Sequence, residues 1–234
     1  MRTRILALAA VLLTGVVVWM PGSEPATATV NPADFSAPVA NPYFPLRPGT
    51  VFVYNGTEGP DRLVEHLRVT RRTKDIQGVT TIVIHDVLYA NGTLQEKTTD
   101  WYADDNSGSA WYFGEHTALY DHQGHVTSRE GSWQAGVNGG VAGIIMPADP
   151  KPTDAYRQEF LAGHAEDQAW IVARHGRAHL PIGHLRNVVR SYEWTRLEPN
   201  VLSLKLYAPH LGIVQEADVA GGEEFLQLVA VRHV

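Results

Sequence analysis

The sequence predicts a mostly β fold, in which one large curved antiparallel sheet or half-barrel forms a single domain with few short helices. Runs rich in Val, Ile, Thr and aromatic residues recur from residue 50 to the C-terminus, and such residues suit a pleated surface. Short turn signals separate these runs, as in a C-terminal β-meander. No long helical pattern is present that would cover a parallel sheet.

The N-terminal segment 1–28 has the pattern of a signal peptide. Arg2 and Arg4 precede an apolar run that ends at Met20, and this run is shorter than the roughly 20 residues that span a bilayer as a helix. The string Ala-Thr-Ala that ends at Ala28 has the small residues that signal peptidase requires. We expect cleavage after Ala28 and a secreted or extracytoplasmic protein, with an uncleaved membrane anchor as the alternative.

Two further parts follow the signal peptide. Residues 29–48 contain five prolines and are predicted to form an extended leader. Residues 49–234 are predicted to form a single β-rich domain, which is long enough to bury a substantial core.

Composition excludes several classes of function. The chain has no cysteine, so disulfides, thiol catalysis and cysteine-ligated metal sites are absent. Its net charge of −6 argues against nucleic acid as a partner, because phosphate binding needs a basic face. The same charge predicts no strong membrane binding after signal cleavage, because it gives no attraction to anionic lipid.

Local patterns predict several strands. Asn91-Gly92 lies between two strand-like runs, which is a strong hairpin signal because both residues tolerate positive φ. The aromatic runs 101–102 and 111–113 flank a polar turn in the same way. Residues 156–173 fit either a helical face or two strands that turn at Gly163, and the strand-rich surroundings favour the strands.

The last fifty residues predict an antiparallel meander with one buried face. Leu202, Leu204 and Leu206 alternate with Ser203 and Lys205. Alternate residues of a strand share a face. We therefore expect the leucine row to face the core and Lys205 to face solvent.

Six strings together resemble a known family. They are TDWY at 99–102, WYFGE at 111–115, EGSW at 130–133, GIIMPA at 143–148, YRQE at 156–159 and YAPHLGIV at 207–214. Over residues 41–230 the chain resembles a family of uncharacterised secreted bacterial proteins. The last string also resembles the final hairpin of the curved antiparallel sheets in lipoprotein-carrier-like folds. The resemblance implies export and a curved sheet, and it implies no activity.

Two sets of residues are candidate metal ligands. His122 and His125 flank a glycine, where a tight turn can bring two imidazoles together, and His116 is a possible third ligand. Asp104 opens a stretch that spaces oxygen ligands as a calcium loop does, with Glu115 at the twelfth position, but a glycine stands at the fifth, where a ligand is needed. Exposed loop histidines and a plain hairpin turn explain both patterns, so we expect neither a metal nor any other cofactor.

Four carboxylates are candidate catalytic residues, because paired carboxylates held roughly 5–9.5 Å apart hydrolyse glycosidic bonds. They are Glu130, Glu159, Glu166 and Asp167. The alternative is that they are solvated or paired with Arg129 and Arg157.

The sequence leaves two hypotheses for function. The aromatic residues Trp101, Trp111 and Trp133, in a chain without a catalytic motif, favour a secreted or envelope protein that binds a small apolar or mixed ligand, or a glycan. The alternative is a secreted hydrolase that uses the acidic residues on a glycan-type substrate.

Overall fold

A computed structural model describes residues 30–234, and the predicted signal peptide and its cleavage site lie outside this range. The prediction of a mostly β fold is confirmed: in the described residues, one large antiparallel sheet of fifteen strands makes up most of the structure. One short 3-10 helix, η1 (Pro32–Phe35), precedes it. Between residues 30 and 234 no helix has the length and apolar character needed to cross a membrane.

The strands are β1 (Thr50–Glu58), β2 (Asp61–Ile76), β3 (Val79–Ala90), β4 (Thr93–Asp104), β5 (Ala110–Tyr120), β6 (Val126–Ser128), β7 (Trp133–Gln134), β8 (Val141–Met146), β9 (Ala155–Arg157), β10 (Glu159–Phe160), β11 (Gln168–Leu180), β12 (Gly183–Trp194), β13 (Leu202–Ala208), β14 (Gly212–Ala220) and β15 (Glu224–His233).

The sheet consists of two meanders. Along the sheet the order is β10-β8-β5-β4-β3-β2-β1-β15-β14-β13-β12-β11-β9, and β6 and β7 pair with β5. The first meander runs from β1 to β5 and the second from β11 to β15. Antiparallel pairing of β1 with β15, from Thr50 opposite His233 to Glu58 opposite Glu224, joins them in the middle of the sheet.

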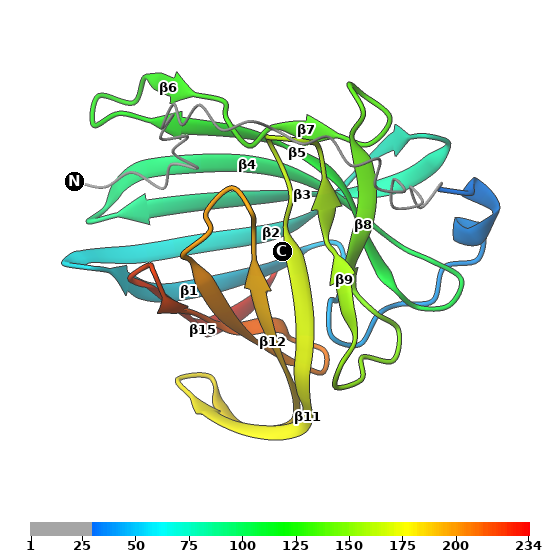
Figure 1. Ribbon diagram of the computed structural model, residues 1–234. Coiled ribbons are helices and arrows are strands. Elements are labelled where there is room, and N and C mark those ends of the chain that lie inside the picture. The colour runs from blue at the N-terminus through cyan, green and yellow to red at the C-terminus, as the bar shows by residue number, and fades with distance from the viewer. Residues whose placement is uncertain (1–29) are drawn as a thin grey trace, which may run out of the picture.

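The sheet curls until its two ends come together. Strand β11 crosses in front of the strands of the first meander (Figure 1). At one end β9 pairs with β11, and at the other end β10 pairs with β8. Only the buried Gln158 separates β9 from β10. The sheet is therefore open, without a continuous ladder around a barrel, but one short chain segment links its two ends.

Three hydrophobic clusters form the core. The first includes Phe52 and Leu226 from the middle of the sheet. The second is aromatic and includes Trp101 and Phe113 from the first meander. The third gathers side chains from both meanders, and it takes in Phe44 from the segment predicted as a leader.

The leader segment is built into the domain. The buried side chain of Asn41 donates hydrogen bonds to the backbone carbonyls of Gly108 (2.7 Å) and Met146 (3.1 Å). Its oxygen accepts the backbone N–H groups of Tyr43 (2.8 Å) and Phe44 (3.1 Å). Asn41 thereby ties this segment to the turn between β4 and β5 and to the end of β8.

The predicted orientation of β13 is wrong for Lys205 and right for Leu206. Lys205 faces the interior of the curl, where its Nζ lies 3.2 Å from Glu193 Oε2 and 3.3 Å from Glu216 Oε1. The pairing of β13 is regular around Lys205, so Leu204 and Leu206 point to the opposite face, where Leu206 is buried in the first hydrophobic cluster. The reason is that the curl encloses a polar space, so the charged face of this strand is the inner one.

Candidate functional site: a cavity lined with carboxylates

A cavity of about 400 Å³ lies inside the curl of the sheet. Strands from both meanders line it, together with the segment that joins the two ends of the sheet. Nine carboxyl side chains belong to its lining: Glu65, Asp86, Glu96, Glu115, Glu130, Glu159, Asp167, Glu198 and Glu216. Lys205 is the one Lys or Arg in that lining, and His164 adds an imidazole. We call this space the inner cavity.

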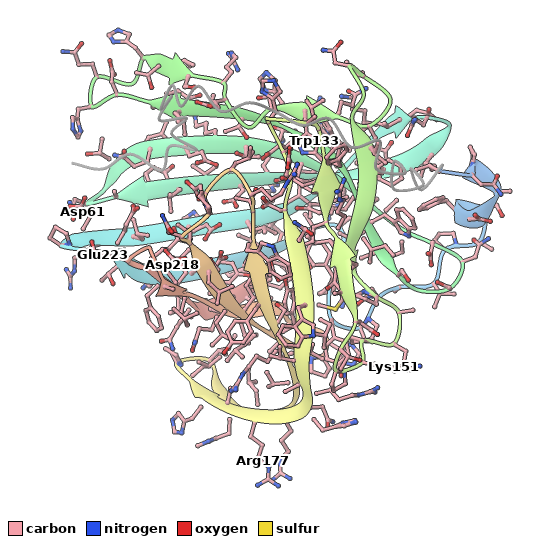
Figure 2. All side chains as sticks on the ribbon, viewed as in Figure 1. Asp61, Trp133, Lys151, Arg177, Asp218 and Glu223 are labelled. Carbon is pink, nitrogen blue, oxygen red and sulfur yellow. The ribbon has the colours of Figure 1, made fainter. Side chains whose placement is uncertain are left out.

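A second cavity, of about 580 Å³, adjoins the first. The two share Glu96, Leu119 and Glu130 in their linings, so they are direct neighbours. Leu63 and Leu88 add apolar surface to this outer cavity. Its lining also extends to Asp61, at the left-hand end of the strands in Figure 2, where β2 begins. A mixed, partly apolar cavity therefore lies beside an acidic one.

Lys205 is held by a network centred on Glu193. The Glu193 carboxylate accepts hydrogen bonds from Tyr207 (2.7 Å), Ser191 (2.7 Å) and Gln158 (3.1 Å) in addition to its ion pair with Lys205. Burial disfavours the ammonium of Lys205, but its carboxylate neighbours outweigh this effect and hold the pKa of Lys205 well above its usual value. Lys205 is therefore charged at neutral pH.

Several carboxyl groups of the inner cavity retain their protons more strongly than usual. Burial raises the pKa of Glu115 to about 8 and that of Asp167 to about 6. Burial and neighbouring carboxylates also raise the pKa of Glu159. The accessible surface of Asp167 belongs to the cavity wall, so solvent reaches its carboxyl group although the curl surrounds it. The cavity therefore combines protonated and ionised carboxyl groups near neutral pH.

Behind the cavity wall lies a further acidic side chain. Asp100 is buried and accepts a hydrogen bond of 2.8 Å from the Tyr112 hydroxyl. Burial and the charge of Glu115 raise the pKa of Asp100 well above its usual value. Tyr112 itself lines the cavity and stacks on Tyr102 with 4.5 Å between ring centroids. Tyr112 therefore links the buried Asp100 to the wall of the cavity.

The structure brings three of the four predicted catalytic carboxylates to the cavity. Glu159 and Asp167 line its inner part, and the exposed Glu130 lies where the two cavities meet. Glu166 is not part of either lining, because it forms an ion pair with Arg196. Glu166 is thus salt-bridged, but to Arg196 and not to Arg129 or Arg157 as the alternative proposed. A catalytic role for the other three stays a prediction.

None of the predicted tryptophans is part of either lining, although Trp133 packs edge-on against the lining residue Tyr112. The Lys74 ammonium sits 3.3 Å from the ring centroid of Trp101. The indole N–H of Trp111 donates to Asp105 over 2.9 Å. Trp133 is buried in the aromatic cluster with Trp101. Their binding role stays a prediction, and the cavity offers a different set of side chains for that purpose.

The candidate metal ligands are scattered. His116, His122 and His125 are exposed side chains, and His125 pairs with Asp121 at 3.3 Å. Asp104 lies at the end of β4, and burial raises its pKa to about 7. Within residues 30–234, no three His, Cys, Asp or Glu side chains are grouped as metal ligands.

Most of the cavity lining was not foreseen. Glu65, Asp86, Glu115 and Glu216 each lie inside a strand. The available signal was the alternation of polar side chains within strand-like runs, such as Glu96, Thr98 and Asp100. In the structure, Thr98 donates a hydrogen bond of 2.9 Å to Glu96. Alternation shows that such residues share a face, but only the curl of the sheet makes that face an interior.

Comparisons with known proteins give the following results. No family model matches the chain, and no curated protein matches it in sequence. One similar solved structure is a Bacteroides fragilis protein described as exported, with a YmcC-like fold. Its sequence identity to this chain is 14% and the TM-score is 0.48; the match covers 82% of this chain and 100% of the other. Another is a Parabacteroides distasonis protein described as a lipoprotein, with 12% identity, a TM-score of 0.43, and coverage of 83% and 100%. What this chain does must follow from its own residues.

Proposed function

We propose that the protein is a secreted or envelope protein that binds a small amphipathic ligand with a cationic group, without catalysis. The observation that carries this proposal is that the two cavities adjoin and share three lining residues. The acidic inner cavity, in which Lys205 is the one lysine or arginine from the described residues, lies beside a cavity with leucine side chains in its wall. Each cavity has a volume typical of small-molecule sites, roughly 300–1,000 Å³.

The charge of the inner cavity favours a cation. Two unit charges 4 Å apart interact by about 4 kcal/mol in surroundings of intermediate dielectric constant, about 20. A ligand ammonium near Glu115 or Asp167 would stabilise their ionised forms, so binding at neutral pH would release protons. For an anionic ligand, Lys205 is the one lysine or arginine that the described residues place in the lining, and Glu193 and Glu216 already neutralise it.

The outer cavity favours an apolar group attached to the cation. Leu63, Leu88, Ala90 and Leu119 line it together with polar side chains. Burial of apolar surface contributes about 25 cal/mol per Å². A chain of several methylene groups therefore fits the outer cavity while the charged end occupies the inner one.

The test uses two detergents with the same alkyl chain. Isothermal titration calorimetry would compare dodecyltrimethylammonium with dodecyl sulfate, each below its micelle concentration, in buffers of different ionisation enthalpy. We expect the cationic probe to bind with proton release and the anionic probe to bind at least tenfold more weakly. Equal binding of both probes, or binding of neither, would refute the proposal.

A matched pair of variants localises the site. Glu96→Gln removes one charge where the cavities meet and is expected to weaken binding of the cationic probe about tenfold, or about 1.4 kcal/mol. Glu223→Gln removes one charge from a side chain outside both linings (Figure 2) and should leave the affinity unchanged. Equal losses in both variants would indicate a nonspecific charge effect.

The second candidate function is an acid-catalysed hydrolase. The observation in its favour is that Glu115 and Asp167, with pKa values raised to about 8 and about 6, line the same cavity. Near neutral pH such a pair offers a general acid and a general base. An assay on a panel of glycans decides: turnover that Asp167→Asn abolishes would support hydrolysis, and the absence of turnover by the unmodified protein would exclude it for those substrates.

A further inference from the structure

The β11–β12 hairpin has a charge opposite to that of the whole chain. Residues 174–190 contain four arginines, three histidines and no acidic residue, whereas the chain has a net charge of −6. Charges more than about 10 Å apart are largely screened at physiological ionic strength. The local charge, and not the net charge, therefore decides what approaches this hairpin.

Four of these side chains form a two-by-two array. Arg177 lies directly opposite Arg186, and His179 lies directly opposite His184 in the antiparallel ladder. The rings of the two histidines have centroids 3.9 Å apart. Alternate residues of a strand share a face, so all four side chains lie on the same face, and all four are exposed. We call this array the cationic face.

The opposite side of the hairpin fixes the cationic face outward. Leu180 is buried in the first hydrophobic cluster, and Ile182 and Leu185 pack against that cluster. The hairpin bends beneath the rest of the sheet (Figure 1), and the Arg177 side chain points away from the body of the protein (Figure 2). The apolar side therefore covers the core while the cationic face meets solvent.

The facing arginines of the cationic face repel each other and destabilise the hairpin unless an external anion binds to them. Like charges directly opposite each other destabilise an antiparallel pair. Arg174 forms an ion pair of 2.9 Å with Asp149. In contrast, within the part of the chain that the structure describes, no carboxylate pairs with Arg177 or Arg186. An external anion would remove this repulsion.

We propose that the cationic face docks the protein on the surface of an anionic phospholipid bilayer. Arginine guanidinium groups bind phosphate oxygens in a fork geometry that lysine cannot provide. The array covers an area rather than a line, and none of its residues lines a cavity described above, which suits a flat surface better than a single polymer strand. None of the large exposed hydrophobic side chains lies between residues 171 and 218, so contact is electrostatic and does not involve insertion.

Vesicle co-sedimentation tests this proposal. Protein recovered after export from the expression host would be mixed with vesicles of phosphatidylcholine, with or without phosphatidylglycerol, at low and at high salt. We expect binding only with phosphatidylglycerol, and only at low salt. Each arginine near an anionic surface contributes about fivefold to partitioning, so Arg177→Gln with Arg186→Gln should weaken binding about 30-fold.

Two further double variants separate charge from folding. Arg177→Lys with Arg186→Lys keeps the charge and should retain most of the binding. Arg62→Gln with Arg129→Gln removes the same charge from two other exposed positions and should bind as the unmodified protein does. The proposal is overturned if all three double variants bind alike, if anionic vesicles do not bind the unmodified protein, or if soluble polyphosphate binds it while anionic vesicles do not.

Discussion

Replacement of Lys205 by methionine tests whether the interior of the curl is an acidic space that needs an internal cation. The substitution keeps the length of the side chain and removes its charge. It leaves Glu193 and Glu216 without the ammonium that lies 3.2 and 3.3 Å from them. The side-chain exposures are 20% for Lys205 and 8% for Glu193, so most of this pair is removed from water.

The expected loss of stability follows from that burial. Removal of one partner from a buried ion pair costs about 3–5 kcal/mol, because the other charge stays desolvated. The 24% exposure of Glu216 allows some hydration, so we expect the lower end, about 3 kcal/mol. For a domain of this size that corresponds to a fall of about 6–12 °C in the melting temperature.

The assay is thermal unfolding followed by circular dichroism at neutral and at acidic pH. The difference between variant and unmodified protein should shrink on acidification, because protonated carboxyl groups no longer need a counter-charge. Lys151→Met is the matched control, since this lysine is 63% exposed and its pair with Asp149 lies at the surface; it should cost at most about 1 kcal/mol. A Lys205→Met variant as stable as this control would refute an acidic interior that depends on Lys205.

Three further predictions concern stability. Because the pKa of Glu115 is raised to about 8, the folded protein keeps a proton that the unfolded chain releases above about pH 4.5. Calorimetry should therefore show the melting temperature falling from about pH 5 to about pH 8. Glu115→Gln should flatten this profile, and an unchanged profile would contradict the raised pKa. Leu206→Ala, at a buried position, should cost about 2–5 kcal/mol in urea unfolding, and the half-buried Leu204→Ala should cost less; the reverse order would contradict the packing of β13. Asn41→Ala removes five hydrogen bonds of a buried amide and should lower the urea midpoint by an amount equivalent to about 1–3 kcal/mol, more than Asn31→Ala at the exposed cap of η1.

The local signals in the sequence predicted the strands well. The Asn91-Gly92 pair forms the turn between β3 and β4, with φ values of 51° and 80°. The preference for strands in residues 156–173 is confirmed by β9, β10 and the start of β11. Turn residues with positive φ and β-branched runs act over a few positions, so a single sequence reveals them.

The orientation of the faces could not be predicted in the same way. The pattern of leucines around Lys205 was interpreted on the assumption that the charged face of a sheet is the solvated one. In this protein, strands far apart in the sequence curl around the charged face, so Lys205 meets Glu193 and Glu216 there. The acidic cavity depends on these long-range pairings, and local alternation does not encode them.

The pairing of β1 with β15 affects how the chain tolerates truncation and rearrangement. The first and last strands meet in the centre of the sheet, and the N–H of Val234 donates to the carbonyl of Gly49 over 2.8 Å. Loss of the final ten residues therefore removes a central strand, β15, rather than an edge strand. It leaves β1 of the first meander and β14 of the second without a neighbour on one side. New termini could open at an exposed hairpin such as Asn91-Gly92 without breaking a ladder. The linker that joins the old ends would have to reach from Val234 to the start of the leader segment, because Asn41 and Phe44 of that segment belong to the domain. In a circularly permuted chain of this kind, β15 and β1 would be connected through the linker before folding begins.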